Sequence, residues 1–188
     1  MKSSTAKSNS LKPGLPRVGI SGCLLGEEIR YDGGHRWHSG IARWIGPRVE
    51  WVSLCPETEV GLGVPREPIH MVGDPAQPRL IDSKTGRDWT RAMTEYSRQK
   101  IAVMKNLNLD GFIFKRSSPS CGLDAVKVYE DETLGEWTRK GRGIFAHYFV
   151  LAFPNLPAVE EEVLSTRNGA KRFLDSVRRY HESRLRRR

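Results

Sequence analysis

Long apolar runs are missing from this sequence: no stretch approaches the roughly 18 consecutive apolar residues that a membrane-spanning helix needs. The N-terminal residues are rich in serine and lysine and lack the apolar core of a secretory signal. These two absences exclude an integral membrane protein and argue against ordinary secretion. We therefore expect a cytoplasmic protein.

Cysteine is scarce as well. The 188 residues contain three cysteines. They are an odd number spread over about 100 positions, which excludes the dense, even disulfide framework of a small secreted domain. No C-x-x-C or H-x-x-x-H pair is present, so the usual short-spaced ligand pairs of a zinc site are also missing. A reducing compartment is the natural setting for such a chain.

Internal repeats and a second domain are absent too. With 38% hydrophobic residues in 188 positions, the chain is long enough to bury the core of one domain. Residues 1–16 have few large apolar side chains and two prolines, so we expect a disordered basic arm there. We place one α/β domain over 17–165 and a basic amphipathic helix over 166–188.

The formal net charge of +9 is concentrated at the two ends of the chain. Residues 1–17 carry +4, residues 167–188 carry +7, and the body between them carries −2. Basic ends of this kind can follow the phosphates of RNA or DNA and raise association rates in a salt-dependent way. A pair of solubilising tails explains the same charge pattern.

Short apolar runs and amphipathic periods predict the elements of an α/β fold. We expect three strands and three helices, the strands at 17–21, 49–54 and 109–115 and the helices at 88–106, 143–153 and 168–187. The glycine-rich segment 26–48 is expected to be mostly loop, with a short helix near 40–45. The glycines and prolines of 61–78 predict irregular structure. Strands that alternate with helices favour a Rossmann-like open sheet with helices on both faces.

Each cysteine follows a predicted strand and stands beside turn residues: Cys23 in SGCLLG, Cys55 in LCPE and Cys121 in SPSCG. Because the loops beyond the carboxyl ends of parallel strands meet in one crevice, the three thiols can share one site. Soft thiolates suit zinc or an iron–sulfur cluster, and three of them leave one iron of a [4Fe–4S] cluster without a protein ligand. A redox disulfide, a lone cysteine nucleophile and three buried small hydrophobes remain as alternatives.

Five motifs, in order along most of the chain, resemble the TudS-type thiouracil desulfidases. They are S-G-C-L-L-G (21–26), R-Y-D-G-G-H (30–35), C-P-E-T-E-V-G-L-G-V-P-R (55–66), S-P-S-C-G (118–122) and K-G-R-G-I-F-A (140–146). The segment G-D-P-A-Q-P-R-L at 73–80 resembles the branch of the family that is proposed to remove sulfur from 4-thiouridine in tRNA. In that branch a helical RNA-associated domain follows this one, and here the chain ends at Arg188, where that domain would begin.

The resemblance implies a [4Fe–4S] cluster bound by Cys23, Cys55 and Cys121, with the sulfur of a thiolated pyrimidine docking on the fourth iron. It also implies a redox-neutral hydrolysis, in which water adds to the ring carbon, oxygen replaces sulfur, and sulfide is later released. Glu57, two residues past Cys55, is then expected to act as general base and acid. A loop carboxylate paired with Arg66 is the alternative for Glu57.

The remaining site residues follow from the same motifs. Ser118 resembles a serine that helps to position substrate or water, and the alternative is that Ser118 or Ser120 caps the turn that presents Cys121. Tyr31, Asp32 and His35 are expected to hydrogen-bond the pyrimidine edge or the cluster sulfides. An Asx-turn within its own loop is the alternative for Asp32.

Two further motifs concern anions. Arg66 is a candidate for binding a substrate phosphate, and pairing with Glu67 is its alternative. Gly141 and Gly143 precede an apolar helix and can turn backbone N–H groups toward an anion, although a tight helix start explains them as well.

The sequence therefore predicts a desulfidase that converts the C=S group of thiouracil, 4-thiouridine or 4-thiouridine in tRNA to C=O, with tRNA held through the basic termini. The alternative is an iron–sulfur or metal-containing module that binds nucleic acid or senses a signal without desulfidase activity. The enzyme requires Glu57 and an open iron, whereas the module requires only the cysteines and the charged ends.

Overall fold

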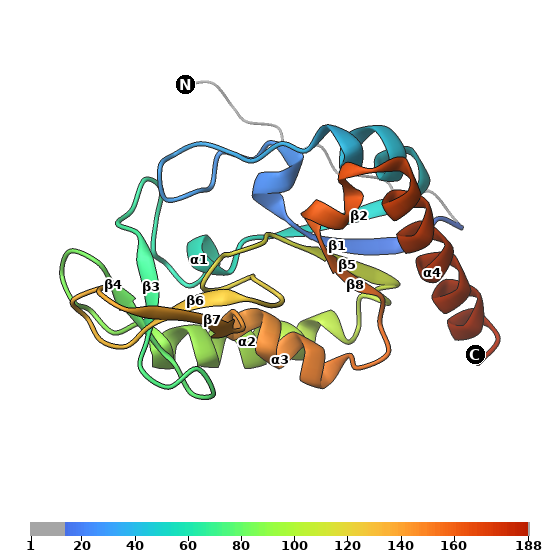
Figure 1. Cartoon of the computed structure of the whole chain (residues 1–188). Coiled ribbons are helices and arrows are strands. Elements are labelled where there is room, and N and C mark those ends of the chain that lie inside the picture. Colours follow the sequence, from blue (N-terminus) through green and yellow to red (C-terminus); the bar gives the residue numbers. More distant parts are fainter. Residues whose placement is uncertain (1–13, 188) are drawn as a thin grey trace, which may run out of the picture.

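Two four-stranded sheets organise residues 14–187, the part of the chain that the computed structural model describes (Figure 1). Sheet A is parallel, in the order β2-β1-β5-β8, with β1 (Arg17–Ser21), β2 (Glu50–Leu54), β5 (Gly111–Phe114) and β8 (Ala158–Glu160). Sheet B is mixed, in the order β4-β3-β6-β7, with β3 (Ile69–Val72), β4 (Arg79–Asp82), β6 (Val126–Tyr129) and β7 (Trp137–Gly141). The two sheets form opposite walls of the site described below.

Helices cover both faces of sheet A. The α-helices are α1 (Pro56–Glu59), α2 (Thr90–Met104), α3 (Ile144–Ala152) and α4 (Arg167–Leu185). The shorter turns are η1 (Gly22–Leu25), η2 (Ile41–Ile45), η3 (Gly46–Arg48) and η4 (Glu161–Ser165). In Figure 1, α2 and α3 lie beneath the sheets, while α4 and η2 lie on the opposite side of sheet A.

The alternation of side chains along β5 shows how sheet A supplies two cores. Phe112 and Phe114 point toward α2 and α3, where they pack against Phe145 and Phe149. Ile113, between them, points to the other side and packs in the core that α4 and η2 complete. All four residues of β5 are buried, which is typical of a central parallel strand. The sequence prediction of an open sheet with helices on both faces is confirmed.

Sheet B corrects the prediction of irregular structure over 61–78, because β3 lies inside that segment. Strands β4, β6, β7 and β8 were not predicted either. These strands have three to five residues each, too few to show a clear period between glycines and prolines. They form because tertiary pairing stabilises them: β3 joins β4 on one side and β6 on the other in sheet B, and β8 pairs with β5 in sheet A.

The last helix packs back onto sheet A. It begins after Thr166, whose hydroxyl accepts a hydrogen bond from Gly169 N at 3.1 Å, and it buries Phe173 and Val177 against the sheet. Near its end, Arg184 and His181 hold the fully buried carboxylate of Asp110. The predicted arm at 1–16 lies outside the described residues except for 14–16, and no described helix is long and apolar enough to span a membrane.

Candidate active site

The site lies where the strand order of sheet A reverses. From β1 the chain continues to β2 on one side of the sheet, whereas from β5 it continues to β8 on the other side. Ligand sites of α/β sheets form at positions where the strand order reverses in this way. A cavity of about 440 Å³ opens there, and all three cysteines line it. The predicted convergence of the three thiols is therefore found in the structure.

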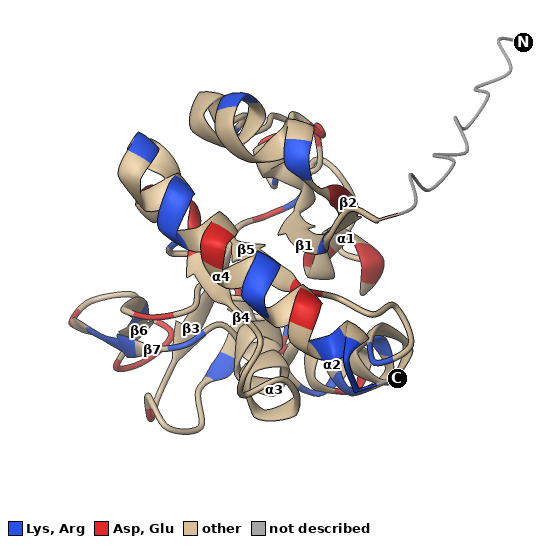
Figure 2. Cartoon of the chain, turned by 90° about the vertical axis from the view of Figure 1, so that its right-hand side faces the viewer, with Lys and Arg blue, Asp and Glu red and all other residues tan. Residues whose placement is uncertain are grey.

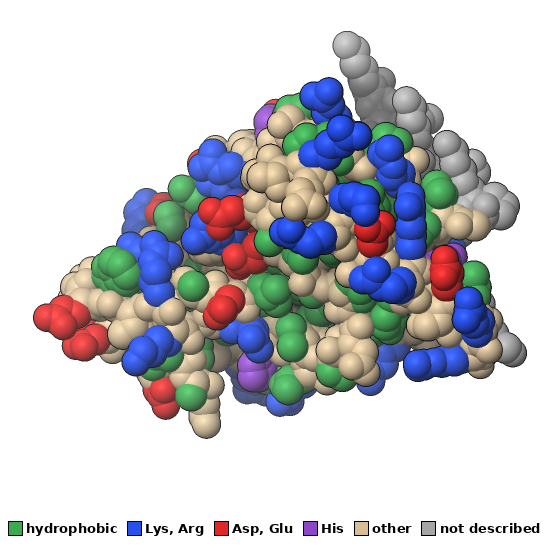
Figure 3. Space-filling view, turned by 45° about the vertical axis from the view of Figure 1, so that its right-hand side comes forward, with side chains coloured by type: hydrophobic (Ala, Val, Ile, Leu, Met, Phe, Trp, Pro, Cys, Tyr) green, Lys and Arg blue, Asp and Glu red, His purple; other side chains and the backbone are tan. Residues whose placement is uncertain are grey.

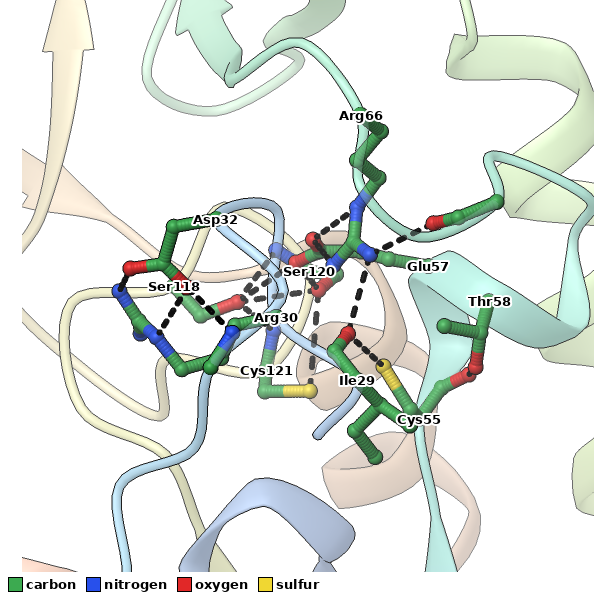
Figure 4. Close-up of polar contacts among 12 residues, drawn as sticks. Ile29, Arg30, Asp32, Cys55, Glu57, Thr58, Arg66, Ser118, Ser120 and Cys121 are labelled. Atoms are coloured by element: carbon green, nitrogen blue, oxygen red, sulfur yellow. Dashed lines mark hydrogen bonds and ion pairs between the residues drawn. The ribbon is translucent and has the colours of Figure 1, made fainter. Parts of the chain in front are cut away.

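Each thiol is placed by a turn that follows a strand of sheet A. Cys23 lies in η1 directly after β1, Cys55 immediately precedes α1 after β2, and Cys121 lies in the loop after β5. Figure 4 shows the sulfur atoms of Cys55 and Cys121 pointing toward one another. Burial raises the pKa of Cys23 to about 12, with the nearby Cys55 adding to the shift. Burial and Cys55 likewise raise the pKa of Cys121, and burial raises that of Cys55.

The arrangement of the thiols discriminates between kinds of metal site. Among the described residues, no three His, Cys, Asp or Glu side chains are close enough to hold a single metal ion. A cubane of four irons and four sulfides is larger than one ion, so its ligands lie farther apart around a cavity. Three separated soft donors in one pocket fit such a cluster, and neutral thiols in so buried a place become stable thiolates only beside a strong positive charge.

The Ser118–Cys121 loop is fastened to the start of α3. Ile144 N and Ala146 N donate to the carbonyl oxygens of Pro119 and Ser120 at 3.1 and 3.2 Å. A Cβ on Gly143 would lie 2.5 Å from the carbonyl carbon of Ser120. The glycine motif therefore serves a tight helix start, and these N–H groups are occupied by the protein's own carbonyls instead of facing an anion.

Glu57 is held from two sides in the same cavity (Figure 4). Its Oε2 atom accepts hydrogen bonds from Arg66 Nε at 3.2 Å and Arg66 Nη2 at 2.5 Å. Its Oε1 atom accepts from Ser118 Oγ at 3.1 Å and from Ser120 Oγ at 2.6 Å. The sequence placed Glu57 and Ser118 in one site, and the structure brings them into contact. It also adds Ser120, which was considered only as a turn cap.

Ser118 caps the turn that presents Cys121, which was the alternative considered for it, and its role toward substrate or water stays a prediction. Its hydroxyl contacts Glu57, and it also accepts hydrogen bonds from the backbone N–H groups of Ser120 and Cys121 at 3.3 and 3.1 Å. One side chain therefore couples the position of the carboxylate to the turn that presents the thiol.

Arg66 forms the ion pair that was the alternative for Glu57. Its side chain is only 4% exposed, and its Nη1 atom donates to the carbonyl oxygens of Ile29 and Gly63 at 3.0 and 2.9 Å. Glu67, the other partner considered for Arg66, pairs with Lys84 instead. The hydrogen bonds that the Arg66 side chain donates therefore fix Glu57 and the neighbouring backbone.

The structure separates the three residues predicted to contact the pyrimidine. Tyr31 lines the cavity and is 40% exposed. Asp32 accepts from Gly34 N and from Arg30, which is the Asx-turn alternative. The Nδ1 atom of His35 accepts from the backbone of its own loop. Asp32 and His35 lie outside the cavity lining.

A model of the 2-thiouracil desulfurase family matches residues 18–162. The chain belongs to this family. The uncharacterised protein YbbK of Bacillus subtilis (strain 168) is 33% identical over 108 residues, which are 55% of this chain and 71% of the relative. The solved structure of the [4Fe-4S]-dependent thiouracil desulfidase TudS matches with a TM-score of 0.62 and 24% identity, over 78% of this chain and 91% of that one. At that identity the likeness shows a shared fold.

In this family member, sheet B supplies the wall opposite the thiols, which the sequence analysis did not foresee. His70 of β3, Lys127 and Tyr129 of β6, and Arg139 of β7 line the cavity. The rings of His70 and Tyr129 meet edge to face with centroids 5.5 Å apart. Burial and the nearby Lys127 lower the pKa of His70. The alternating V-K-V-Y of 126–129 is the one signal that could have revealed this wall.

Proposed function

We propose that this chain is an iron–sulfur desulfidase that replaces the thiocarbonyl sulfur of a thiolated uracil with oxygen and releases sulfide. The observation that carries the proposal is the placement of three thiols, two of them buried and one half-buried, and one carboxylate in a single cavity. Membership in the 2-thiouracil desulfurase family supports the same reaction. The reaction is hydrolytic: C=S and water give C=O and hydrogen sulfide, with no electron donor required.

Cys23, Cys55 and Cys121 are the residues that would hold a [4Fe–4S] cluster. When bound, the cluster supplies an iron without a protein ligand, a Lewis acid with affinity for sulfur. Their positions around the cavity, instead of around one point, support this assignment over a single zinc ion.

Glu57 is the proton carrier of the proposed reaction. Its Oε1 atom accepts the proton of the water that adds to the ring carbon and returns it to the departing sulfur. Ser118 and Ser120 orient this oxygen, and Arg66 holds the other one, so the carboxylate cannot rotate away from the cavity. Arg66 is thus a positioning residue in this proposal and not a phosphate ligand, because Glu57 and two backbone carbonyls already occupy its guanidinium group.

We assign the substrate to nucleotides or tRNA in preference to the free base. Three cationic side chains that line the cavity, Arg36, Lys127 and Arg139, have no ion-pair partner among the described residues. A phosphate group attached to the thiolated nucleoside would satisfy them, whereas a free base would not. Tyr31, exposed at the rim, is placed to contact the pyrimidine, and the basic termini would contact the rest of a tRNA. In this proposal the protein acts in the cytoplasm.

The test starts with iron and acid-labile sulfide per chain, measured on protein purified and reconstituted without oxygen. We expect about four of each, and loss of both in Cys55→Ser. Turnover of 2-thiouracil, 4-thiouridine, 4-thiouridine monophosphate and thiolated tRNA is then followed by the loss of thiocarbonyl absorbance and the release of sulfide. Protein without iron contradicts the mechanism. If the protein contains the cluster but turns over none of these substrates, the proposed activity is wrong and the alternative, a binding or sensory module, is supported.

A further inference from the structure

The cavity-facing side of sheet B extends past the cavity to an exposed tryptophan. Strands β6 and β7 are antiparallel with Tyr129 opposite Trp137. Because side chains alternate along a strand, Lys127, Tyr129, Trp137 and Arg139 project from one face of this pair. The opposite face is buried: Val128 packs there in the core that α2 and α3 complete.

Trp137 lies beside two of the cations that line the cavity. Lys127 Nζ is 4.1 Å from the centroid of the indole ring, and the guanidinium carbon of Arg139 is 5.4 Å from it. Trp137 itself does not line the cavity and is 45% exposed. The two cations therefore connect an aromatic surface outside the cavity with the cavity interior.

We infer that Trp137, Lys127 and Arg139 form a second nucleotide site, which binds the residue adjacent to the thiolated uridine in a single-stranded or loop segment of RNA. The neighbouring base stacks on the indole, and the phosphodiester that joins it to the thiolated nucleotide lies against the two cations. Aromatic rings flanked by cations hold single-stranded nucleic acid in this way, with little dependence on sequence. The inference rests on the proposed function and adds a polymeric substrate to it.

The hairpin also restricts the path of such an RNA. Its tip between β6 and β7 carries four acidic residues, Glu130, Asp131, Glu132 and Glu136. Glu132 pairs with Arg79, and the remaining carboxylates repel a polyanion. The RNA must therefore reach Trp137 from the cavity side of the hairpin and not across its tip.

The test compares Trp137→Ala and Trp137→Tyr in the cluster-loaded enzyme. The substrates are 4-thiouridine and a tetranucleotide with one 4-thiouridine flanked by uridines. We expect Trp137→Ala to raise KM for the tetranucleotide by about ten-fold, a typical value for one lost base stack. The kcat/KM for the nucleoside should stay unchanged, and the tyrosine variant should retain KM for the tetranucleotide. Lys140→Ala is the matched control, since Lys140 lies on β7 outside the cavity lining.

Three outcomes would overturn the inference. An unchanged KM for the tetranucleotide in Trp137→Ala shows that no base stacks there, and an equal loss with nucleoside and tetranucleotide shows that Trp137 only supports the cavity. Displacement of oligouridine by a polyglutamate peptide at equal concentration shows a general anion site. If the wild-type enzyme turns over neither substrate, the proposed function fails. The second site is then tested by fluorescence anisotropy of labelled oligouridine. Weaker binding to Trp137→Ala than to the wild-type protein supports it, and equal binding contradicts it.

Discussion

Glu57 shows how four neighbouring donors define the position of one carboxylate. Arg66 contributes two of these hydrogen bonds and two serine hydroxyls contribute the others. Arg66 is itself fixed by two backbone carbonyls. The proposed role as general base requires a carboxylate held within hydrogen-bonding reach of its proton, and this network restricts Glu57 to one orientation.

We predict that Glu57→Gln loses between about a hundred-fold and ten-thousand-fold in kcat, the usual contribution of a positioned acid–base group. Glutamine has nearly the same shape but cannot take up the proton. Iron per chain should stay at the wild-type value, because the three thiols are unchanged. Glu59→Gln is the control, since Glu59 lies in the same short helix, pairs with Lys100 and does not line the cavity. Wild-type turnover in Glu57→Gln would remove this residue from the mechanism.

Part of the site was predictable at the level of single residues. The three cysteines were placed together because each follows a strand, and the carboxyl ends of parallel strands share one edge of a sheet. Ser120 and the wall residue His70 were not predicted as site residues, because no sequence pattern shows which hydroxyl meets a distant carboxylate or where a short strand pairs. The Asx-turn of Asp32 was foreseen as an alternative, since its hydrogen-bond partners are local in sequence.

Among the secondary-structure elements, the start of α3 controls the position of a thiol. Its first backbone N–H groups bind the carbonyls of the loop that carries Cys121. The contact requires a residue without a side chain at Gly143, where a Cβ would lie 2.8 Å from Cys121 N. The helix therefore fixes the loop through backbone contacts alone.

Gly143→Ala should destabilise the protein by about 1–3 kcal/mol, the usual cost of an overpacked interior site. Because the loop must shift to admit the methyl group, we also expect less iron per chain after reconstitution. Urea unfolding and iron analysis measure the two effects. Gly135→Ala is the matched control, since the nearest atom to its Cβ would be 3.7 Å away. Unchanged stability and iron content in Gly143→Ala would show that the loop does not depend on this contact.

The elements of sheet A were predictable except for the three-residue strand β8, and those of sheet B were not. Strand β1 has its predicted bounds, β2 and β5 are shorter than predicted by one to three residues, and α2, α3 and α4 lie at the predicted positions. Their apolar runs are long enough to show in the sequence. Sheet B consists of four- and five-residue strands that are stabilised by partners up to about 60 positions away. Their existence depends on tertiary pairing that propensity does not encode.

For the molecule as a whole, the distribution of charge along α4 defines one basic surface (Figures 2 and 3). Figure 2 shows Lys and Arg positions recurring along this helix, which also contains the acidic residues Asp175 and Glu182. Arg184 is different, because it turns inward and holds Asp110 together with His181. Removing the end of the helix would therefore remove a buried ion pair as well as surface charge.

Asp110→Asn tests the buried contact. It should destabilise the protein by about 3 kcal/mol, because it leaves a mostly buried arginine without a counter-charge. Asp110 is fully buried and accepts hydrogen bonds from Arg184 and from the backbone N–H of Arg17. Asp175→Asn breaks an exposed pair with Lys171, so it should cost less than about 1 kcal/mol. Urea unfolding distinguishes them, and equal costs would contradict this account.

The exposed arginines of α4, together with Arg186 directly after it, can be tested without disturbing that contact. Changing Arg172, Arg179 and Arg186 to glutamine should weaken tRNA binding and lower the salt slope of log Kd by up to about 0.9 for each arginine that contacts a phosphate. Glutamines at Arg91, Arg98 and Lys105, which have the same spacing along α2 and just beyond it, remove equal charge as the control. Equal effects of both sets would show that only net charge matters.

The two walls of the cavity come from different sheets: sheet A carries every thiol, whereas sheet B carries His70, Lys127, Tyr129 and Arg139. Substitutions that change the substrate can therefore fall on residues of sheet B, while the residues that keep the cysteine site intact belong to sheet A. Descendants of one ancestor can exchange the wall formed by sheet B while they inherit the thiols unchanged. A laboratory library confined to these four positions would follow the same route, with each variant compared at constant iron content.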